Sequence, residues 1–276
     1  MDQTSESRLG QTPGQYDANY GNFQTDLYEQ IRREAFGEDI GQNSWLTAQE
    51  QDRFLAWLAL SPGKALLDVA CGSGGPALRI AAKTGCSVVG VDIHAQAVST
   101  ACSLATQRSL SARADFRVVD AAQELPFPKA SFDAITCIDA INHLPNRSNV
   151  LAGWVSLLKP GGLLLFTDPI IVTGALTNAE IAVRSSTSYY QFVPQGYDAR
   201  LIAESGLQML ASEDVTSNMA EVAARRHAAR AARSTAVRKL EGDLAFDTQQ
   251  EFLAVSTRIA KERRLSRFLF VAKKLP

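Results

Sequence analysis

A glycine-rich turn between an apolar run and a helical pattern is the part of the sequence best suited to hold a ligand. The segment LLDVACGSGGPALRIA covers residues 66–81. Gly72 and Gly74 lack a Cβ, so the backbone can turn sharply there and approach a bound molecule closely. The following helix would present free N–H groups and partial positive charge at its N-terminus. The turn also satisfies the loose dinucleotide pattern G-x-G-x-x-A, so by itself it indicates a nucleotide-like ligand without selecting one.

Two carboxylates follow the next strand-like runs. Asp92 ends SVVGVD, and its side chain could accept hydrogen bonds from both hydroxyls of a ribose, as in adenosine ligands and in NAD alike. Asp120 ends the run after it, where its carboxylate and the Ala121 amide could meet an adenine edge. Either aspartate could instead cap a helix or a turn.

The segment from Ile138 to Leu144, IDAINHL, places two further reactive groups at the end of another strand-like run. Asp139 could accept a proton or a hydrogen bond from an amine or hydroxyl. His143 carries an imidazole, which titrates near neutrality and suits proton transfer, although a purely structural histidine is the alternative. No Cys/His cluster has the spacing of a zinc site, so no metal is expected.

The elements that must position these groups follow a strand–helix alternation from about residue 64. Strand-like runs cover residues 65–70, 87–92, 115–120, 132–139 and 162–170. Helical periodicity covers residues 76–85, 94–107 and 148–158. The pattern predicts an α/β fold with a doubly wound, largely parallel sheet, because its strands are apolar on both faces. Ligands bind such sheets at the carboxyl ends of the strands, where the glycine turn and the aspartates fall.

The rest of the chain divides around this core. We expect a disordered tail at 1–15, an N-terminal helical cap at 16–63, a nucleoside-binding core at 64–170 and helical lid insertions at 171–196 and 218–264. Residues 197–217 and 265–276 would complete the sheet. An arginine- and alanine-rich run at 223–239 is interpreted as a solvated helix face, with phosphate or nucleic-acid contact as the alternative.

Composition excludes several classes of protein. The 276 residues carry a formal net charge of −1, which gives no electrostatic case for nucleic acid or an acidic membrane as partner. No apolar run is long enough to span a bilayer, and the N-terminus lacks an apolar signal core. Together with four cysteines in no disulfide-like pattern, this predicts a cytoplasmic protein; the oligomeric state is left open.

Taken in order, Asp68-x-Ala70-x-Gly72-x-Gly74, Asp92, Asp120 and the later run LLKPGG resemble the class I S-adenosylmethionine (SAM)-dependent methyltransferases. The resemblance covers about residues 64–170 and implies a seven-stranded, Rossmann-like sheet whose last strand, SRFLFVAKK, is antiparallel. It implies SAM as cofactor and S-adenosylhomocysteine as product. The implied cofactor contacts are Ala70, Cys71, Gly72, Gly74, Asp92, Ile93, Asp120, Ala121 and Asp139.

The segment before the core is similar to that of the sarcosine/dimethylglycine and phosphoethanolamine methyltransferases. Tyr28-Glu-Gln-Ile and Phe36-Gly-Glu-Asp-Ile40 resemble their cofactor-covering signature, which adds Tyr28 and Ile40 to the cofactor contacts. The run from Asp139 to Leu144 resembles their D-A-I-x-H-L motif, which implies that His143 pairs with Tyr20 and that Asp139 faces the acceptor. Tyr20, His143 and Asp139 are therefore the catalytic candidates. The acceptor-binding candidates are Tyr20, Arg184, Tyr189, Tyr190 and Tyr197.

The sequence thus predicts a SAM-dependent methyltransferase that transfers the methyl group to a small molecule by in-line displacement. N- or O-methylation is favoured. C-methylation of a natural-product or prenyl-type substrate is the alternative within this family. Alternatives of another class are an NAD(P)-dependent oxidoreductase, which would share the glycine turn and Asp92, and a SAM-binding protein without catalytic activity.

Overall fold

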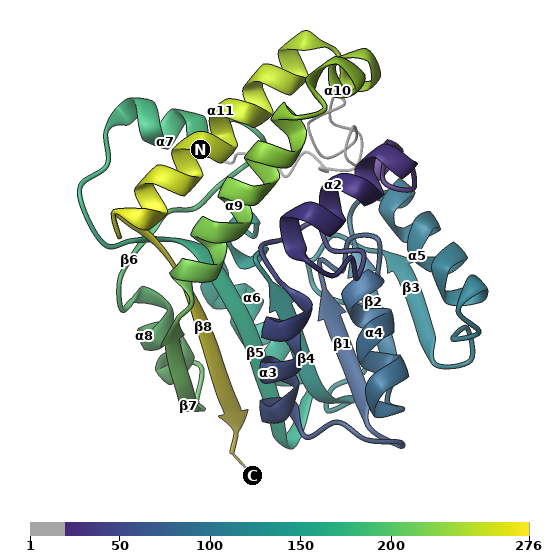
Figure 1. Cartoon of the computed structure of the whole chain (residues 1–276). Coiled ribbons are helices and arrows are strands. Elements are labelled where there is room, and N and C mark those ends of the chain that lie inside the picture. The colour runs from purple at the N-terminus through teal and green to yellow at the C-terminus, as the bar shows by residue number, and fades with distance from the viewer. Residues whose placement is uncertain (1–19, 276) are drawn as a thin grey trace, which may run out of the picture.

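A mixed β-sheet lies at the centre of the molecule. The computed structural model describes residues 20–275, so the expected tail at 1–15 lies outside them. The strand order is β3-β2-β1-β4-β5-β8-β7, and β8 runs antiparallel to both of its neighbours (Figure 1). The strands are β1 (Ala65–Val69), β2 (Ser87–Asp92), β3 (Ala114–Val118), β4 (Phe132–Ile138), β5 (Leu158–Val172), β6 (Val193–Pro194), β7 (Leu207–Asp214) and β8 (Leu265–Lys274). The doubly wound sheet with an antiparallel last strand is confirmed, and the short β6 adds a parallel pairing with β5.

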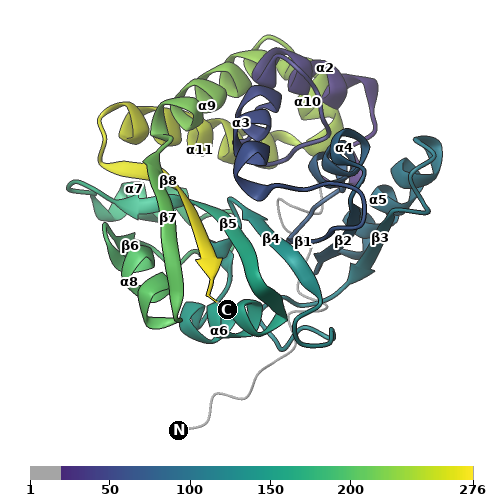
Figure 2. The same cartoon turned by 90° about the horizontal axis from the view of Figure 1, so that it is seen from below.

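Helices cover both faces of the sheet (Figure 2). Leu66 of β1 packs toward one face and its neighbour Leu67 toward the other, because side chains alternate along a strand. On the face of Leu66 lie α3 (Ala48–Leu58), α4 (Gly75–Thr84) and α5 (Ala95–Gln107). On the face of Leu67 lie α6 (Arg147–Leu157) and α8 (Tyr197–Glu204). A short 3₁₀ helix, η1 (Ile141–His143), follows β4.

A third group of helices lies above the carboxyl ends of the parallel strands (Figure 1). It consists of α2 (Asp26–Phe36), α7 (Asn178–Arg184), α9 (Thr216–Ala231), α10 (Ser234–Glu241) and α11 (Asp243–Lys261). Ile31 of α2 packs with Ala229, Val237 and Phe246, one residue from each of α9, α10 and α11. The expected cap (16–63) and the expected lid insertion (218–264) thus pack together through apolar contacts. That the insertions act as a lid stays a prediction.

The five arginines of the expected solvated helix face bond within the protein. Arg230 is 2% exposed and forms an ion pair with Glu241, so for this residue the expectation of a solvated face is wrong. The other four donate as follows: Arg225 to the Ala35 carbonyl, Arg226 to Asn43, Arg233 to Glu34, and Arg238 to Asp243 and Asp247. The arginines tie the helical layer together.

One boundary differs from expectation for a physical reason. The strand expected at 162–170 begins earlier, because β5 starts at Leu158 and includes Lys159-Pro160-Gly161-Gly162. Gly161 has φ +76°, and the pairing with β4 shifts register between Phe132 and Ala134. The strand therefore continues through an irregularity at the glycines, as strands do at bulges.

Candidate active site

The turn between β1 and α4 has left-handed backbone at alternate positions. Ala70, Gly72 and Gly74 have φ values of +57°, +55° and +73°. A Cβ on Gly74 would lie 2.7 Å from Ala101 Cβ and 2.8 Å from the ring of Phe116, so the site excludes any larger residue. Gly74 is thus required for packing between the turn and α5.

Asp92 fixes this turn from the end of β2. Its carboxylate oxygens accept hydrogen bonds from the backbone N–H of Gly72 at 2.8 Å and of His94 at 2.9 Å. The side chain is 5% exposed, and burial raises the pKa of Asp92 above its ordinary value. Each oxygen keeps a further lone pair, so the carboxylate can also accept from two hydroxyls of a ligand.

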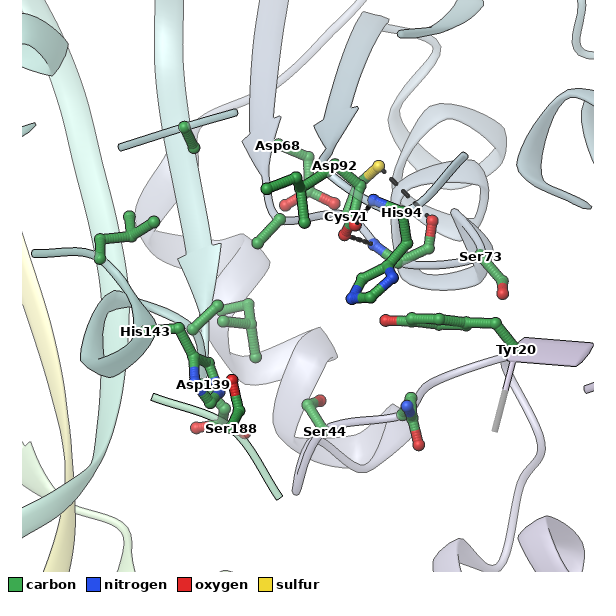
Figure 3. A pocket seen from close by; sticks show the side chains of 18 of the residues that line it. Tyr20, Ser44, Asp68, Cys71, Ser73, Asp92, His94, Asp139, His143 and Ser188 are labelled. Atoms are coloured by element: carbon green, nitrogen blue, oxygen red, sulfur yellow. Dashed lines mark hydrogen bonds between the residues drawn. The ribbon is translucent and has the colours of Figure 1, made fainter. Parts of the chain in front are cut away.

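A cavity of about 840 Å³ opens at the carboxyl ends of β1, β2 and β4 (Figure 3). This volume lies in the range of roughly 300–1,000 Å³ that is typical of small-molecule sites. Eleven of the residues predicted from sequence line it: Tyr20, Ala70, Cys71, Gly72, Asp92, Ile93, Asp120, Ala121, Asp139, His143 and Tyr189. The geometry therefore gathers most of the predicted site around one cavity.

Three predicted cofactor contacts lie outside the cavity lining. Tyr28 donates a hydrogen bond from its hydroxyl to Glu241, inside the helical layer. Ile40 is 4% exposed and packs in the apolar core with α3 and α4. Gly74 faces Ala101 and Phe116 as described above. In this structure Tyr28 and Ile40 pack within the covering segment, and Gly74 packs within the glycine turn.

At the other end of the cavity, the carboxylate of Asp139 already accepts three hydrogen bonds. It accepts from Arg267 Nε at 2.6 Å, from the Thr167 hydroxyl at 2.7 Å and from the Trp45 N–H at 2.9 Å. Arg267 is fully buried and also pairs with Glu50. Burial lowers the pKa of its guanidinium, but the carboxylates of Asp139 and Glu50 outweigh this effect and raise the pKa above its usual range. A carboxylate held in place by three donors has a geometry that suits a positioning role.

His143 lies in η1 beside Asp139. Its Nδ1 is 2.8 Å from the backbone oxygen of Tyr189, and its ring packs edge-on against Tyr190 with centroids 4.6 Å apart. A carbonyl oxygen only accepts, so Nδ1 carries the proton of this bond. In the neutral ring Nε2 then holds the lone pair, which is the arrangement a general base needs.

Tyr20 lies across the cavity from His143 (Figure 3). Its ring packs against His94 with centroids 5.3 Å apart, and a Cβ on Gly72 would lie 3.1 Å from its hydroxyl oxygen. Burial, and after it the charge of Asp92, raises the pKa of Tyr20 well above its ordinary value, so the hydroxyl stays protonated. The expected pairing of Tyr20 with His143 is not formed in this structure.

The predicted acceptor-binding residues divide between two places. Tyr189 lines the main cavity, whereas Arg184 and Tyr190 line a small recess beside it. Arg184 is 1% exposed and stacks over Tyr190 and over Phe252 of α11. Tyr197 begins α8 and packs against the core on the far face of the sheet, outside the lining of both spaces.

Several lining residues were missed by the sequence analysis. Asp68 of β1 is buried and bonded to Thr136, and burial, with a contribution from Asp92, raises its pKa to about 7. Its position at the start of the Asp68-to-Gly74 motif was the signal that could have identified it. Others include the hydroxyl groups of Ser44 and of residues 185–188, which lie in irregular segments without a recognisable pattern.

The donor set fits SAM. Asp92 can hold a ribose diol, the turn at Asp120 and Ala121 borders the same space, and Asp68 places a carboxylate beside the glycine turn, where it can meet an ammonium. Ser73, whose buried hydroxyl has no hydrogen-bond partner in the described residues, also lines the cavity. No three His, Cys, Asp or Glu side chains in residues 20–275 gather as a metal site, and no helix there has the length and apolar character needed to cross a bilayer.

Comparisons with known proteins agree with this fit. Residues 67–166 match a family described as a methyltransferase domain. The chain is 31% identical over 218 residues to the 27-O-demethylrifamycin SV methyltransferase of Amycolatopsis mediterranei. The aligned region covers 74% of this chain and 78% of the relative. The chain is 36% identical over 152 residues to a sterol 24-C-methyltransferase of Gibberella zeae, covering 52% of this chain but 39% of that enzyme.

Among solved structures, a phosphoethanolamine N-methyltransferase of Haemonchus contortus, in complex with phosphomonomethylethanolamine and S-adenosylhomocysteine, superposes with a TM-score of 0.79. It shares 20% identity and covers 96% of this chain and 61% of its own, so this likeness supports the fold alone. The fold, the site and the sequence relatives together show that this chain belongs to the S-adenosylmethionine-dependent methyltransferases.

Proposed function

We propose that this methyltransferase transfers the methyl group to a hydroxyl oxygen of a polar small molecule, with His143 as the general base. The observation that carries the proposal is the bond between His143 Nδ1 and the Tyr189 carbonyl, because it directs the basic Nε2 lone pair to the other side of the ring. An alcohol is a weak nucleophile until its proton is removed, so the reaction gains from a base at this place.

The charges at the acceptor end favour oxygen over nitrogen. Asp139 is the acidic side chain there, and its charge is neutralised by Arg267. Among the described residues that line the adjoining recess, Asp139 is the one carboxylate, so an ammonium acceptor would lack an available anion there, whereas an uncharged alcohol needs none.

The polarity of the same end disfavours a prenyl-type acceptor for C-methylation. Four consecutive hydroxyl-bearing residues, 185–188, line the wall together with Asn43 and Ser44. Ser185 and Ser186 donate to backbone carbonyls and Thr187 bonds the Tyr190 hydroxyl, but a hydrocarbon chain would still take the remaining lone pairs of these hydroxyls out of water. The relative that methylates demethylrifamycin at oxygen agrees with this choice, whereas the sterol relative acts at carbon.

In this mechanism the bound cofactor supplies an electrophilic methyl group on a sulfonium. Asp92 holds its ribose, Asp68 its ammonium, and Asp120 with Ala121 borders the adenine. Residues 41–44 exclude water from above, and Asp139 keeps the end of β4 and the Trp45 backbone in place. His143 would accept the hydroxyl proton as the new C–O bond forms and the methyl–sulfur bond breaks, which leaves S-adenosylhomocysteine. The four cysteines are free thiols, which supports a reducing compartment such as the cytoplasm.

The test is to incubate the enzyme with SAM carrying an isotopically labelled methyl group and with a cell extract, and to identify labelled products by mass spectrometry. We expect a methyl ether. A labelled carbon–methyl or nitrogen–methyl product would refute the proposal. Calorimetric titration with SAM and with NADH separates this enzyme from an oxidoreductase, since NADH binding without SAM binding would exclude methyl transfer.

A further inference from the structure

A small recess continues the main cavity beneath the helical layer. Its volume is about 60 Å³, and it shares Asp139, His143 and Thr187 with the lining of the main cavity. This space is large enough for a hydroxyl group and its carbon.

Asn142 is the unusual residue of this recess. It is 0% exposed, and neither its Nδ2 nor its Oδ1 has a hydrogen-bond partner among the residues that the structure describes. Its backbone is fixed, because its carbonyl accepts from the Gln191 N–H at 2.9 Å. Buried amides are normally bonded, so a side chain with both polar atoms unpaired next to a cavity is expected to meet a ligand.

The chemistry of an amide limits what that ligand group can be. Nδ2 donates and Oδ1 accepts, and a single hydroxyl satisfies both, whereas a carbonyl or ether oxygen satisfies only Nδ2. An ammonium satisfies only Oδ1. A hydroxyl is therefore the group that matches the recess.

Resting on the proposed function, we infer that the acceptor carries a second hydroxyl next to the one that is methylated, and that Asn142 binds this second hydroxyl. Asn142 and His143 are adjacent in η1, and His143 lies at the junction of recess and cavity. A diol can place one oxygen at each residue. Asn142 is then a specificity-determining residue for 1,2-diols.

The test uses matched probes, because the natural acceptor is unidentified. Binding of catechol and phenol, and of cis-cyclohexane-1,2-diol and cyclohexanol, is measured by NMR titration of the S-adenosylhomocysteine complex. We expect each diol to bind at least about tenfold more tightly than its mono-ol, because a site built to bond a hydroxyl discriminates against its absence. In Asn142→Leu, which has similar volume, this ratio should fall to near one. Asn149→Leu, the same change on the exposed side of α6, should keep it.

A ratio near one in the wild-type protein, or an unchanged ratio in Asn142→Leu, would overturn the inference. So would a lower melting temperature of Asn142→Leu than of the wild type, since it would mean that the amide stabilises the fold. A crystal structure of the catechol complex with only an ordered water at Asn142 would do the same. Absence of S-adenosylhomocysteine binding in the same titrations would instead refute the proposed function.

Discussion

Gly75 holds the cofactor-covering segment against the glycine turn, and Gly75→Ala should release it. A Cβ at this position would lie 2.1 Å from the Ile40 carbonyl oxygen, 2.6 Å from Gly41 Cα and 2.7 Å from the Gly41 oxygen. All three are backbone atoms, which no rotamer change can move aside. The segment that begins at Ile40 must therefore shift away from α4.

The size of the effect follows from what the shift disturbs. Forcing one methyl group into a packed site costs about 1–3 kcal/mol. Residues 41–44 line the cavity, so displacing them carries this cost into cofactor binding. A loss of 1–3 kcal/mol corresponds to SAM affinity lower by about 5- to 150-fold.

The assay is calorimetric titration of SAM into wild type, Gly75→Ala and a matched control. Gly153 lies in α6, where an added Cβ meets nothing within 4 Å. Gly153→Ala should bind SAM as the wild type does and gain up to about 1 kcal/mol of stability from helix propensity. If folded Gly75→Ala bound SAM with unchanged affinity, the segment would not be the cover that this reasoning requires.

Three further substitutions test individual roles. Asp92→Ala should weaken SAM binding by about ten- to a hundredfold, because bonds to a buried carboxylate contribute about 1.5–3 kcal/mol; unchanged affinity in calorimetry would remove Asp92 from the ribose site. Since the pKa of Asp68 is raised to about 7, SAM should bind up to about tenfold more tightly at pH 8 than at pH 6, and Asp68→Asn should flatten this profile. Because the pKa of Asp68 is raised in the folded state, its protonated carboxyl stabilises the ligand-free fold at low pH, and this contribution is lost as pH rises from about 4 to about 7. The melting temperature of the ligand-free protein should therefore fall over this range, and it should fall less in Asp68→Asn. His143→Gln should lower kcat at least about a hundredfold while SAM affinity changes little; an equal loss in both would assign His143 to cofactor binding.

Much of the core could be predicted because local pattern and burial agree there. Strands β1, β2 and β4 are largely buried on both faces, so their positions followed from the alternation of apolar runs with helical patterns. Asp92 could be placed at a strand end for the same reason. These features depend on a few neighbouring residues each.

The acceptor end could not be predicted, because it is built by residues far apart in sequence. Arg267 bonds Asp139, 128 residues away, and Glu50, 217 residues away. Within the run SRFLFVAKK, an arginine in a buried strand was itself a sign that a carboxylate would meet it, since buried charges are paired. The sequence could not say which one. The resemblance to other methyltransferases placed Asp139 at the acceptor but could not show that Arg267 neutralises it.

The same ion pair explains how cofactor cover and acceptor site are joined. Arg267 holds Asp139, and Asp139 holds the Trp45 N–H, while Asn218 of α9 donates to the Trp45 carbonyl and to Glu50. Residues 40–45 are thus anchored at one end on Gly75 and at the other end on this buried network. In the proposed mechanism Asp139 serves this anchor, and proton transfer is assigned to His143, whose Nδ1 bonds the Tyr189 carbonyl. One carboxylate and one imidazole that follow the same strand would then divide the work, because the first holds residues 40–45 in place and the second acts on the acceptor.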